Sequence, residues 1–258
     1  MHRRSFIGAL GGLGALAAPA RPAEEKRRRF YLLEQFFLKN GPQVGREHEF
    51  MEKFLVPALS AVHSGPKIYL EAMVAPQMPQ LVAIYGFESL DHLWNTHLKM
   101  MENAELMKKS AELESDPDAA LEQQVNTLLE ATAFSPEIVP LDPPPASPRL
   151  FELRVYHSPT WRQLAALHDR FAGPEIKIFH RCGIHPVLYG STVFGANMPS
   201  LTYLIPFGSL AEREKTWSAF GADPEWIKVR NESTARHGQI ASLINVSLYR
   251  ATSYSPVR

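Results

Sequence analysis

The segment PSLTYLIPFGSL, from Pro199 to Leu210, decides the fold of this chain because an earlier segment has the same pattern. That segment, PQLVAIYGFESL from Pro79 to Leu90, lies 120 residues before it. In both, a proline precedes an apolar strand candidate and a Ser-Leu pair follows it. Two further pairs of segments repeat at the same offset of 120: residues 30–36 with 150–156, and 131–136 with 251–256. Separated matches at one fixed offset predict two copies of one structural unit.

Each copy is expected to contain the element order strand, helix, strand, strand, helix, strand. In the second copy, Gly183 is placed to end the first helix in the left-handed conformation. Ser209, with Glu212 three residues later, forms a capping box that starts the second helix. The predicted strands cover about residues 30–37, 67–74, 80–87 and 126–134 in the first copy and about 150–157, 187–194, 200–207 and 244–253 in the second. The first helices are predicted over about 43–62 and 159–181.

The second helix of the second copy is expected to pause near Gly221 and to restart at Asp223. An aspartate can cap a helix, and Pro224 suits the first helical position. The segment from Ser115 to Asp118 predicts a similar restart in the first copy, but at a different offset. The break is therefore expected to recur without keeping its position.

The copies are expected to be two domains, residues 28–135 and 150–254, joined by a linker over 136–149. The joining segment contains six prolines in the fifteen residues 135–149. Prolines at this density favour an extended, stiff chain that is neither a helix nor a central strand.

The first 23 residues differ from the rest and are expected to be a signal peptide. Arg3 and Arg4 precede a charge-free apolar run that ends at Ala18, and this pattern resembles a twin-arginine export signal. The run is too short to span a bilayer as a helix. The alternative is an acid-poor transit peptide, since the first acidic residue is Glu24. We expect export to the periplasm or the cell exterior, with no stable membrane span.

The composition argues against nucleic-acid binding and against structures that depend on several cysteines. The chain has 27 Lys and Arg against 27 Asp and Glu, so it lacks the basic excess that is typical of nucleic-acid-binding proteins. Its one cysteine, Cys182, permits neither an intrachain disulfide nor a cysteine-rich zinc site.

The repeated unit predicts the fold class. A β-α-β-β-α-β unit folds as a ferredoxin-like α+β domain. Two such domains in tandem can pack sheet to sheet, with their helices outside. We therefore expect an α+β protein in which one chain forms the equivalent of a dimeric α+β barrel.

Four segments of the second copy carry a resemblance to the NIPSNAP family: FELRVY at 151–156, the strand entry at 183–190, FGSLAER at 207–213 and ADPEW at 222–226. The resemblance is stronger over 150–252 than over 30–134, where Leu32 and Glu34 depart from the pattern. It implies the dimeric α+β barrel fold. That superfamily also includes small monooxygenases and haem-binding enzymes, but NIPSNAP proteins have no well-established reaction.

Strand alternation suggests a site on the first strand of the second copy. Phe151, Leu153 and Val155 share one face, which is expected to meet the helices. The opposite face, expected to look into the barrel, carries a carboxylate, a guanidinium and a phenol. The candidate ligand-binding residues on barrel-facing positions are Glu34, Glu152, Arg154, Tyr156 and Arg250. They indicate either a polar pocket for a small anionic or carbonyl-bearing ligand or an internal Glu-Arg pair that needs no ligand.

The histidines do not predict a metal site. His180, Cys182 and His185 cluster at a helix end, but their spacing matches no structural zinc pattern. His63, His92 and His97 could each supply a haem ligand, and no feature singles one out. No cofactor is therefore predicted, although haem remains open.

Three functions fit these features. The leading hypothesis is an exported protein that binds a small organic ligand or a partner, because no phosphate loop or nucleophile motif is present. The first alternative is a monooxygenase- or isomerase-like enzyme that uses the Glu152 face, with or without haem. The second is an assembly module whose helices pair with another subunit, which includes a homo-oligomer.

Overall fold

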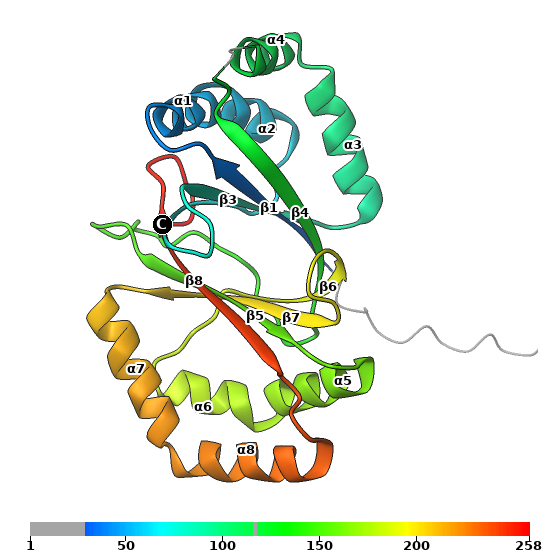
Figure 1. Ribbon diagram of the computed structural model, residues 1–258, viewed down its shortest axis with the longest axis vertical. Helices are drawn as coiled ribbons and strands as arrows, with labels where there is room; N and C mark the ends of the chain where they lie inside the picture. The colour runs from blue at the N-terminus through cyan, green and yellow to red at the C-terminus, as the bar shows by residue number, and fades with distance from the viewer. Residues whose placement is uncertain (1–28, 116–117) are drawn as a thin grey trace, which may run out of the picture.

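Two layers of helices enclose a closed eight-stranded barrel (Figure 1). The computed structural model describes residues 29–115 and 118–258. The expected signal peptide, residues 1–23, lies outside the described residues, as do Asp116 and Pro117 of the expected helix restart. Within the described ranges, no helix combines the length and the apolar character needed to cross a membrane.

The strands follow the predicted repeat closely. Those of the first half are β1 (Phe30–Leu38), β2 (Lys67–Val74), β3 (Gln80–Phe87) and β4 (Leu121–Ala131). Those of the second half are β5 (Leu150–His157), β6 (Leu188–Phe194), β7 (Ser200–Phe207) and β8 (Leu243–Ala251). Neighbouring strands are antiparallel in the order β1-β3-β2-β8-β5-β7-β6-β4. The two halves therefore join through β2 with β8 and through β4 with β6.

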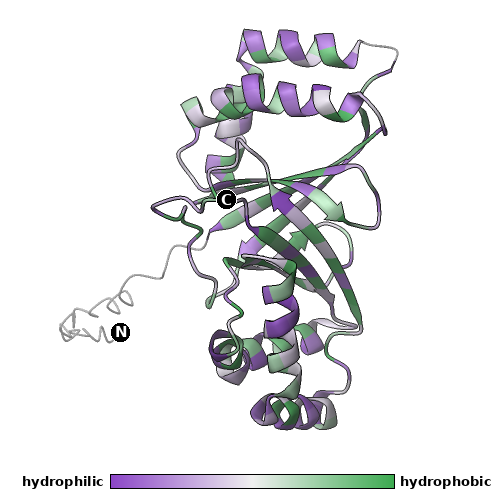
Figure 2. Ribbon diagram, turned by 90° about the vertical axis from the view of Figure 1, so that its left-hand side faces the viewer, coloured by the Kyte–Doolittle hydropathy of each residue, from purple (hydrophilic) through white to green (hydrophobic). Residues whose placement is uncertain are grey.

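Each half contributes one helical layer, and the two layers lie on opposite sides of the barrel (Figure 1). The first layer contains α1 (Gln43–Phe50), the π-helical turn η1 (Met51–Leu55), α2 (Val56–Val62), α3 (Leu90–Met101) and α4 (Ala104–Glu114). The second contains α5 (Trp161–Arg170), η2 (Phe171–Glu175), α6 (Ile176–Arg181), α7 (Leu210–Ala222) and α8 (Pro224–His237). Hydrophobic residues dominate the strands, whereas the helices mix hydrophobic and hydrophilic residues (Figure 2). The helices are therefore amphipathic covers for the outer face of the barrel.

The helix ends confirm most of the predicted punctuation. The Ser209 hydroxyl accepts a hydrogen bond from the Glu212 backbone N–H at 3.1 Å. Gly183 has φ +84°, and its left-handed conformation allows the chain to leave α6 without a Cβ clash. Asp223 caps α8, with its Oδ1 accepting a hydrogen bond from the Trp226 N–H at 3.0 Å.

The predicted restart at Ser115–Asp118 in the first half is wrong. Ser115 ends α4, and the break between α3 and α4 occurs earlier, at Asn103. The Asn103 Oδ1 accepts a hydrogen bond from the Leu106 N–H at 3.0 Å, which is the cap that Asp223 makes 120 residues later. The helix break therefore keeps its position in the repeat, because asparagine and aspartate cap helices equally well.

The barrel interior contains an apolar core and, at one end, a cavity with many polar lining residues. Its buried cluster includes Phe151 and Leu153 from β5 together with Leu33 and Tyr31 from β1. Val155 lies with Leu153 on the wall of a cavity at one end of the barrel interior. The predicted facing of β5 is therefore reversed: its apolar residues look into the barrel and its polar residues look toward the helices.

The chain segments after β4 and β8 lock the two halves together. The Ser135 hydroxyl accepts a hydrogen bond from the Tyr189 N–H in the second half, at 3.0 Å. The Ser255 hydroxyl accepts the equivalent bond from the Tyr69 N–H in the first half, also at 3.0 Å. Ile138, in the proline-rich segment, is buried in the barrel cluster. Each repeat thus ends on the surface of the other, which ties the two halves into one barrel.

Candidate functional site

The predicted site residues do not form one site. Glu152, Arg154 and Tyr156 lie together on the outer face of β5, under the helices of the second half. Glu34 lies on the outer face of β1 in the first half, where it lines a separate cavity. Arg250 is exposed on β8, opposite Glu71 of β2, and lies in neither place.

The polar residues of β5 form a closed network with α7. Glu152 is 0% exposed, and its carboxylate accepts hydrogen bonds from the guanidinium groups of Arg154 and Arg213. It also accepts one from the Trp217 indole N–H at 3.1 Å. The Arg154 guanidinium lies 4.2 Å from the Trp217 ring centre, within reach of a cation–π interaction. Arg213 also pairs with the carboxylate of Glu214, so two guanidinium groups face two carboxylates, as the alternative of an internal Glu-Arg pair expects.

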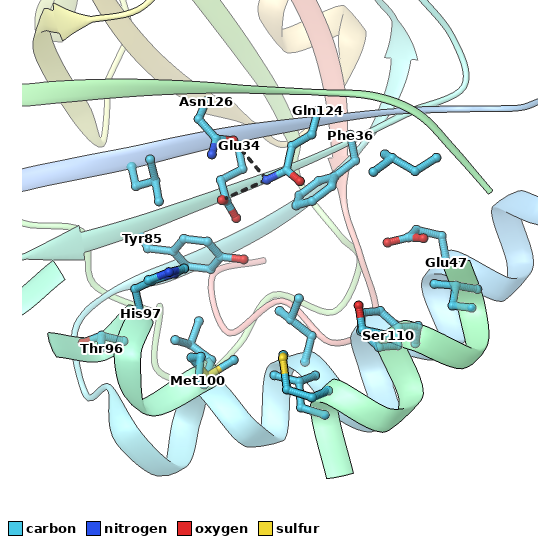
Figure 3. Close-up of a pocket in the computed structure, with 18 of the residues that line it drawn as sticks. Glu34, Phe36, Glu47, Tyr85, Thr96, His97, Met100, Ser110, Gln124 and Asn126 are labelled. Atoms are coloured by element: carbon cyan, nitrogen blue, oxygen red, sulfur yellow. Dashed lines mark hydrogen bonds between the residues drawn. The ribbon is translucent and has the colours of Figure 1, made fainter. Parts of the chain in front are cut away.

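The first half has a cavity of about 540 Å³ where its helices cross the outer face of β1, β3 and β4 (Figure 3). Most of its wall is apolar and aromatic. The apolar lining includes Leu32, Phe36, Phe50, Leu55, Leu59, Phe87, Leu93, Trp94, Met100, Leu106, Met107 and Leu113. A volume of this size, with few polar groups, is typical of small-molecule sites.

Glu34 is the central polar group of this cavity. Its side chain projects from β1 toward Tyr85, with His97 of α3 beside the tyrosine ring (Figure 3). The Gln124 amide donates a hydrogen bond to Glu34 Oε1 at 3.2 Å and contacts the Asn126 Oδ1 at 3.1 Å. Burial raises the pKa of Glu34 to about 7, although hydrogen bonds from Gln124 and Tyr85 oppose this rise. A carboxyl group with this pKa can accept or donate a proton near neutral pH.

A second acidic group lies at another part of the same cavity. Glu47 of α1 is buried, and Glu114 stands at the end of α4. Burial, and to a lesser extent the charge of Glu114, raises the pKa of Glu47. Carboxylates therefore occupy two parts of the cavity wall, one at Glu34 and one at Glu47 and Glu114.

Comparison of residues 120 apart shows which side chains differ between the cavity of the first half and the corresponding region of the second half. Met100 and Leu106 occupy the positions that Phe220 and Trp226 take in the second half. The rings of Phe220 and Trp226 pack with their centres 4.4 Å apart. A hollow of about 630 Å³ remains beside α8, and its lining includes both aromatic rings and the predicted site residue Tyr156. Glu152, Arg154, Arg213 and Trp217 do not line it. The smaller side chains of the first half thus leave the space beside Glu34 open, whereas the hollow of the second half lies away from Glu152.

Sequence reasoning missed several residues of this site. Tyr85, Gln124 and Asn126 come from β3 and β4, and they reach Glu34 only because the sheet places those strands on either side of β1. The strand register brings them together, since Glu34 of β1 pairs with Ala83 of β3 and with Asn126 of β4. His97 was considered only as a haem ligand.

The other histidines lie outside this cavity. His63 Nδ1 and His92 Nε2 are 3.4 Å apart, and burial lowers the pKa of His63 to about 4. The rings of His180 and His185 stack with their centres 5.0 Å apart. Over residues 29–115 and 118–258, no group of three or more His, Cys, Asp and Glu side chains is arranged to hold a metal ion.

Comparisons with known proteins agree with the barrel and with the family resemblance of the second half. Residues 151–256 match the model of the NIPSNAP family, so the second half carries the domain that its sequence predicted. No curated protein matches the chain in sequence.

Solved structures are similar in fold. One is a proposed monooxygenase from Fusobacterium nucleatum, with 9% identity, 88% of this chain and 93% of that chain covered, and a TM-score of 0.57. Another is an anthrone oxidase-like protein, with 13% identity, 91% and 95% covered, and a TM-score of 0.54. A NIPSNAP-like domain protein from Burkholderia xenovorans matches 44% of this chain and 93% of its own, with 16% identity and a TM-score of 0.36. At these identities the first two matches show the α+β barrel fold and leave the reaction open.

Proposed function

We propose that the whole chain is a NIPSNAP-type protein of two tandem ferredoxin-like repeats, and that it binds a small organic molecule in the cavity of the first half. The observation that carries the proposal is the cavity of about 540 Å³ around Glu34. The element order of each half and the NIPSNAP match over 151–256 support the repeat assignment.

The difference between the halves favours a binding role. The second half fills the corresponding space with aromatic rings and a balanced ion network. The first half instead combines apolar walls with Glu34, Tyr85 and His97 at one place. A folded protein gains stability by filling its interior, so an open apolar space with a few convergent polar groups is a default candidate for a ligand site.

Filling the cavity with the residues of the other half is expected to block binding. The double variant Met100→Phe/Leu106→Trp introduces the side chains found at Phe220 and Trp226, which the same framework already accommodates. We expect the native chain to bind the neutral apolar dye Nile red with saturable fluorescence enhancement. The variant should bind it at least about tenfold more weakly, since the apolar contact area is lost.

The matched control makes a similar size change outside the cavity. Ile227→Trp, on an exposed part of α8, should leave dye binding unchanged. Equal binding by the native chain and by the cavity-filling variant, with both folded by circular dichroism, would remove the proposed site.

A proton-transfer enzyme is the second candidate function. The pKa of Glu34, about 7, favours it because a general acid or base works best near the operating pH. Under this candidate the bound molecule is changed chemically. Mass spectrometry of ligand recovered after incubation distinguishes the two functions, because simple binding returns it unaltered.

Haem fits this cavity poorly. Its anionic propionate groups are stabilised by cationic donors, but among the described residues the lining offers no lysine or arginine and contains Glu34, Glu47 and Glu114. His97 is the one histidine of that lining. We therefore propose a ligand other than haem.

We also propose that residues 1–23 direct export through the twin-arginine pathway. The support is the pair Arg3 and Arg4 before a charge-free apolar run. In a host with that pathway, the full chain should be recovered outside the cytoplasm with its leader removed. The double variant Arg3→Lys/Arg4→Lys should remain in the cytoplasm at full length, and unchanged export of this variant would contradict the proposal.

A further inference from the structure

In the second half of the chain, a buried carboxylate between the strands and the helices is neutralised by arginines. Glu152 is held by the cations of Arg154 and Arg213, and Arg154 also lies against the Trp217 ring. In the first half the two arginine positions are Glu34 and Leu93, and the Glu152 position is Leu32. The first half therefore keeps a carboxylate on the strand but supplies no protein cation for it.

No ion pair within the described residues involves Glu34. Its hydrogen-bond donors, Gln124 and Tyr85, are neutral. Glu34 is half-buried. A carboxylate that is partly removed from water, without a cation, is stabilised when it becomes protonated or receives a charged partner. The negative charge of Glu34 is thus not neutralised by a cation among the described residues.

The remaining charges near the cavity do not supply that partner. Its two other carboxylates, Glu47 and Glu114, add negative charge. Lys39 pairs with Asp118 at 3.5 Å, and Arg46 donates a hydrogen bond to the carbonyl of Asp118, both away from Glu34. Lys109 pairs with Glu112 at 2.7 Å, and His97 is the one lining group that could become cationic.

We infer that the cavity of the first half selects an apolar amine, whose ammonium group pairs with Glu34 while its hydrocarbon part fills the aromatic space. This inference rests on the proposed ligand-binding function and names its ligand class. The aromatic faces of Phe36, Tyr85, Phe87 and Trp94 suit it, because aromatic rings attract cations as well as hydrocarbon. Burial raises the pKa of Glu34, and only the neutral groups of Gln124 and Tyr85 oppose that rise.

Three probes that share a naphthyl group and differ in charge test the charge preference: 1-naphthylmethylamine, 1-naphthylmethanol and 1-naphthoate. Each is titrated against the native chain with bound Nile red at pH 8, where Glu34 is ionised and an alkylamine remains protonated. The amine should displace the dye at about tenfold or more lower concentration than the alcohol, since a charge-assisted contact adds to the shared apolar burial. The naphthoate should displace it most weakly.

The variant Glu34→Gln separates charge from shape. It keeps the size of the side chain, so the alcohol should bind as before, while the advantage of the amine over the alcohol should fall to about twofold or less. Glu232→Gln, on exposed α8, is the matched control and should keep the full preference.

The outcomes distinguish the two proposals. Dye displacement by the alcohol as strong as by the amine overturns the amine assignment but leaves the ligand site intact. Retention of the amine preference by Glu34→Gln likewise overturns the amine assignment alone. Failure of the native chain to bind Nile red or any of the three probes overturns the binding function itself.

Discussion

Replacing Glu152 by leucine is expected to lower the free energy of unfolding by about 3 to 5 kcal/mol, the usual cost of removing one partner from a buried ion network. Glu152 is 0% exposed and receives donors from Arg154, Arg213 and Trp217. Its loss leaves the Arg154 guanidinium under the helices without its anion, and leaves Arg213 with the exposed Glu214 alone. Urea unfolding followed by circular dichroism measures the change.

A triple variant distinguishes an ionic from a purely steric cause. In Glu152→Leu/Arg154→Met/Arg213→Leu the stranded cations are also removed, and the first half already has leucine at two of these positions, Leu32 and Leu93. We expect this variant to recover at least about half of the lost stability, because apolar packing often replaces a buried ion network without loss. A triple variant that is less stable than Glu152→Leu would show that shape, rather than unpaired charge, dominates.

The repeat made most of the architecture predictable. A proline, an apolar strand and a capping serine recur 120 residues apart, and the structure places β3 and β7 at those positions. Local signals of this kind depend on near neighbours in the chain, so they survive without tertiary information. The break in the second helix of the first half was misplaced because an Asp-Pro pair near residue 116 is a stronger local signal than Asn103.

The facing of β5 could not be decided from alternation. The pattern FELRVY shows which residues share a face, but both faces of a barrel strand covered by helices are buried. What places Glu152 outward is its partners on α7, Arg213 and Trp217, which lie about sixty positions later in the chain. The helix layer, not the strand, determines which side can receive a charge.

The cavity was hidden for a related reason. It depends on the volume of side chains at matched positions, such as Met100 against Phe220 and Leu106 against Trp226. A residue-by-residue comparison of the two copies contains this difference, but only the fold shows that these positions face Glu34. Of the five candidate residues, Glu34 alone lines the cavity.

Replacing Glu34 by glutamine is expected to stabilise the protein at pH 8 and to change it little at pH 4. The pKa of Glu34 is about 7 in the folded protein, against an ordinary value of 4.5. A group whose pKa rises on folding holds its proton more tightly in the folded state. Its favourable contribution is therefore complete below pH 4.5 and is lost as the pH rises through 7.

At pH 8 the native chain must keep an ionised Glu34 in a mainly apolar cavity, whereas glutamine there is neutral. The variant should be more stable by about 1 to 3 kcal/mol at pH 8 and should differ by less than about 0.5 kcal/mol at pH 4, as measured by urea unfolding at both values. Glu122→Gln, an exposed carboxylate of β4, should show no such change between the two pH values. A variant that is no more stable than the native chain at pH 8 would contradict the prediction. A carboxylate that lowers the free energy of unfolding does not serve folding. A higher stability of Glu34→Gln at pH 8 would therefore itself argue that Glu34 serves ligand binding.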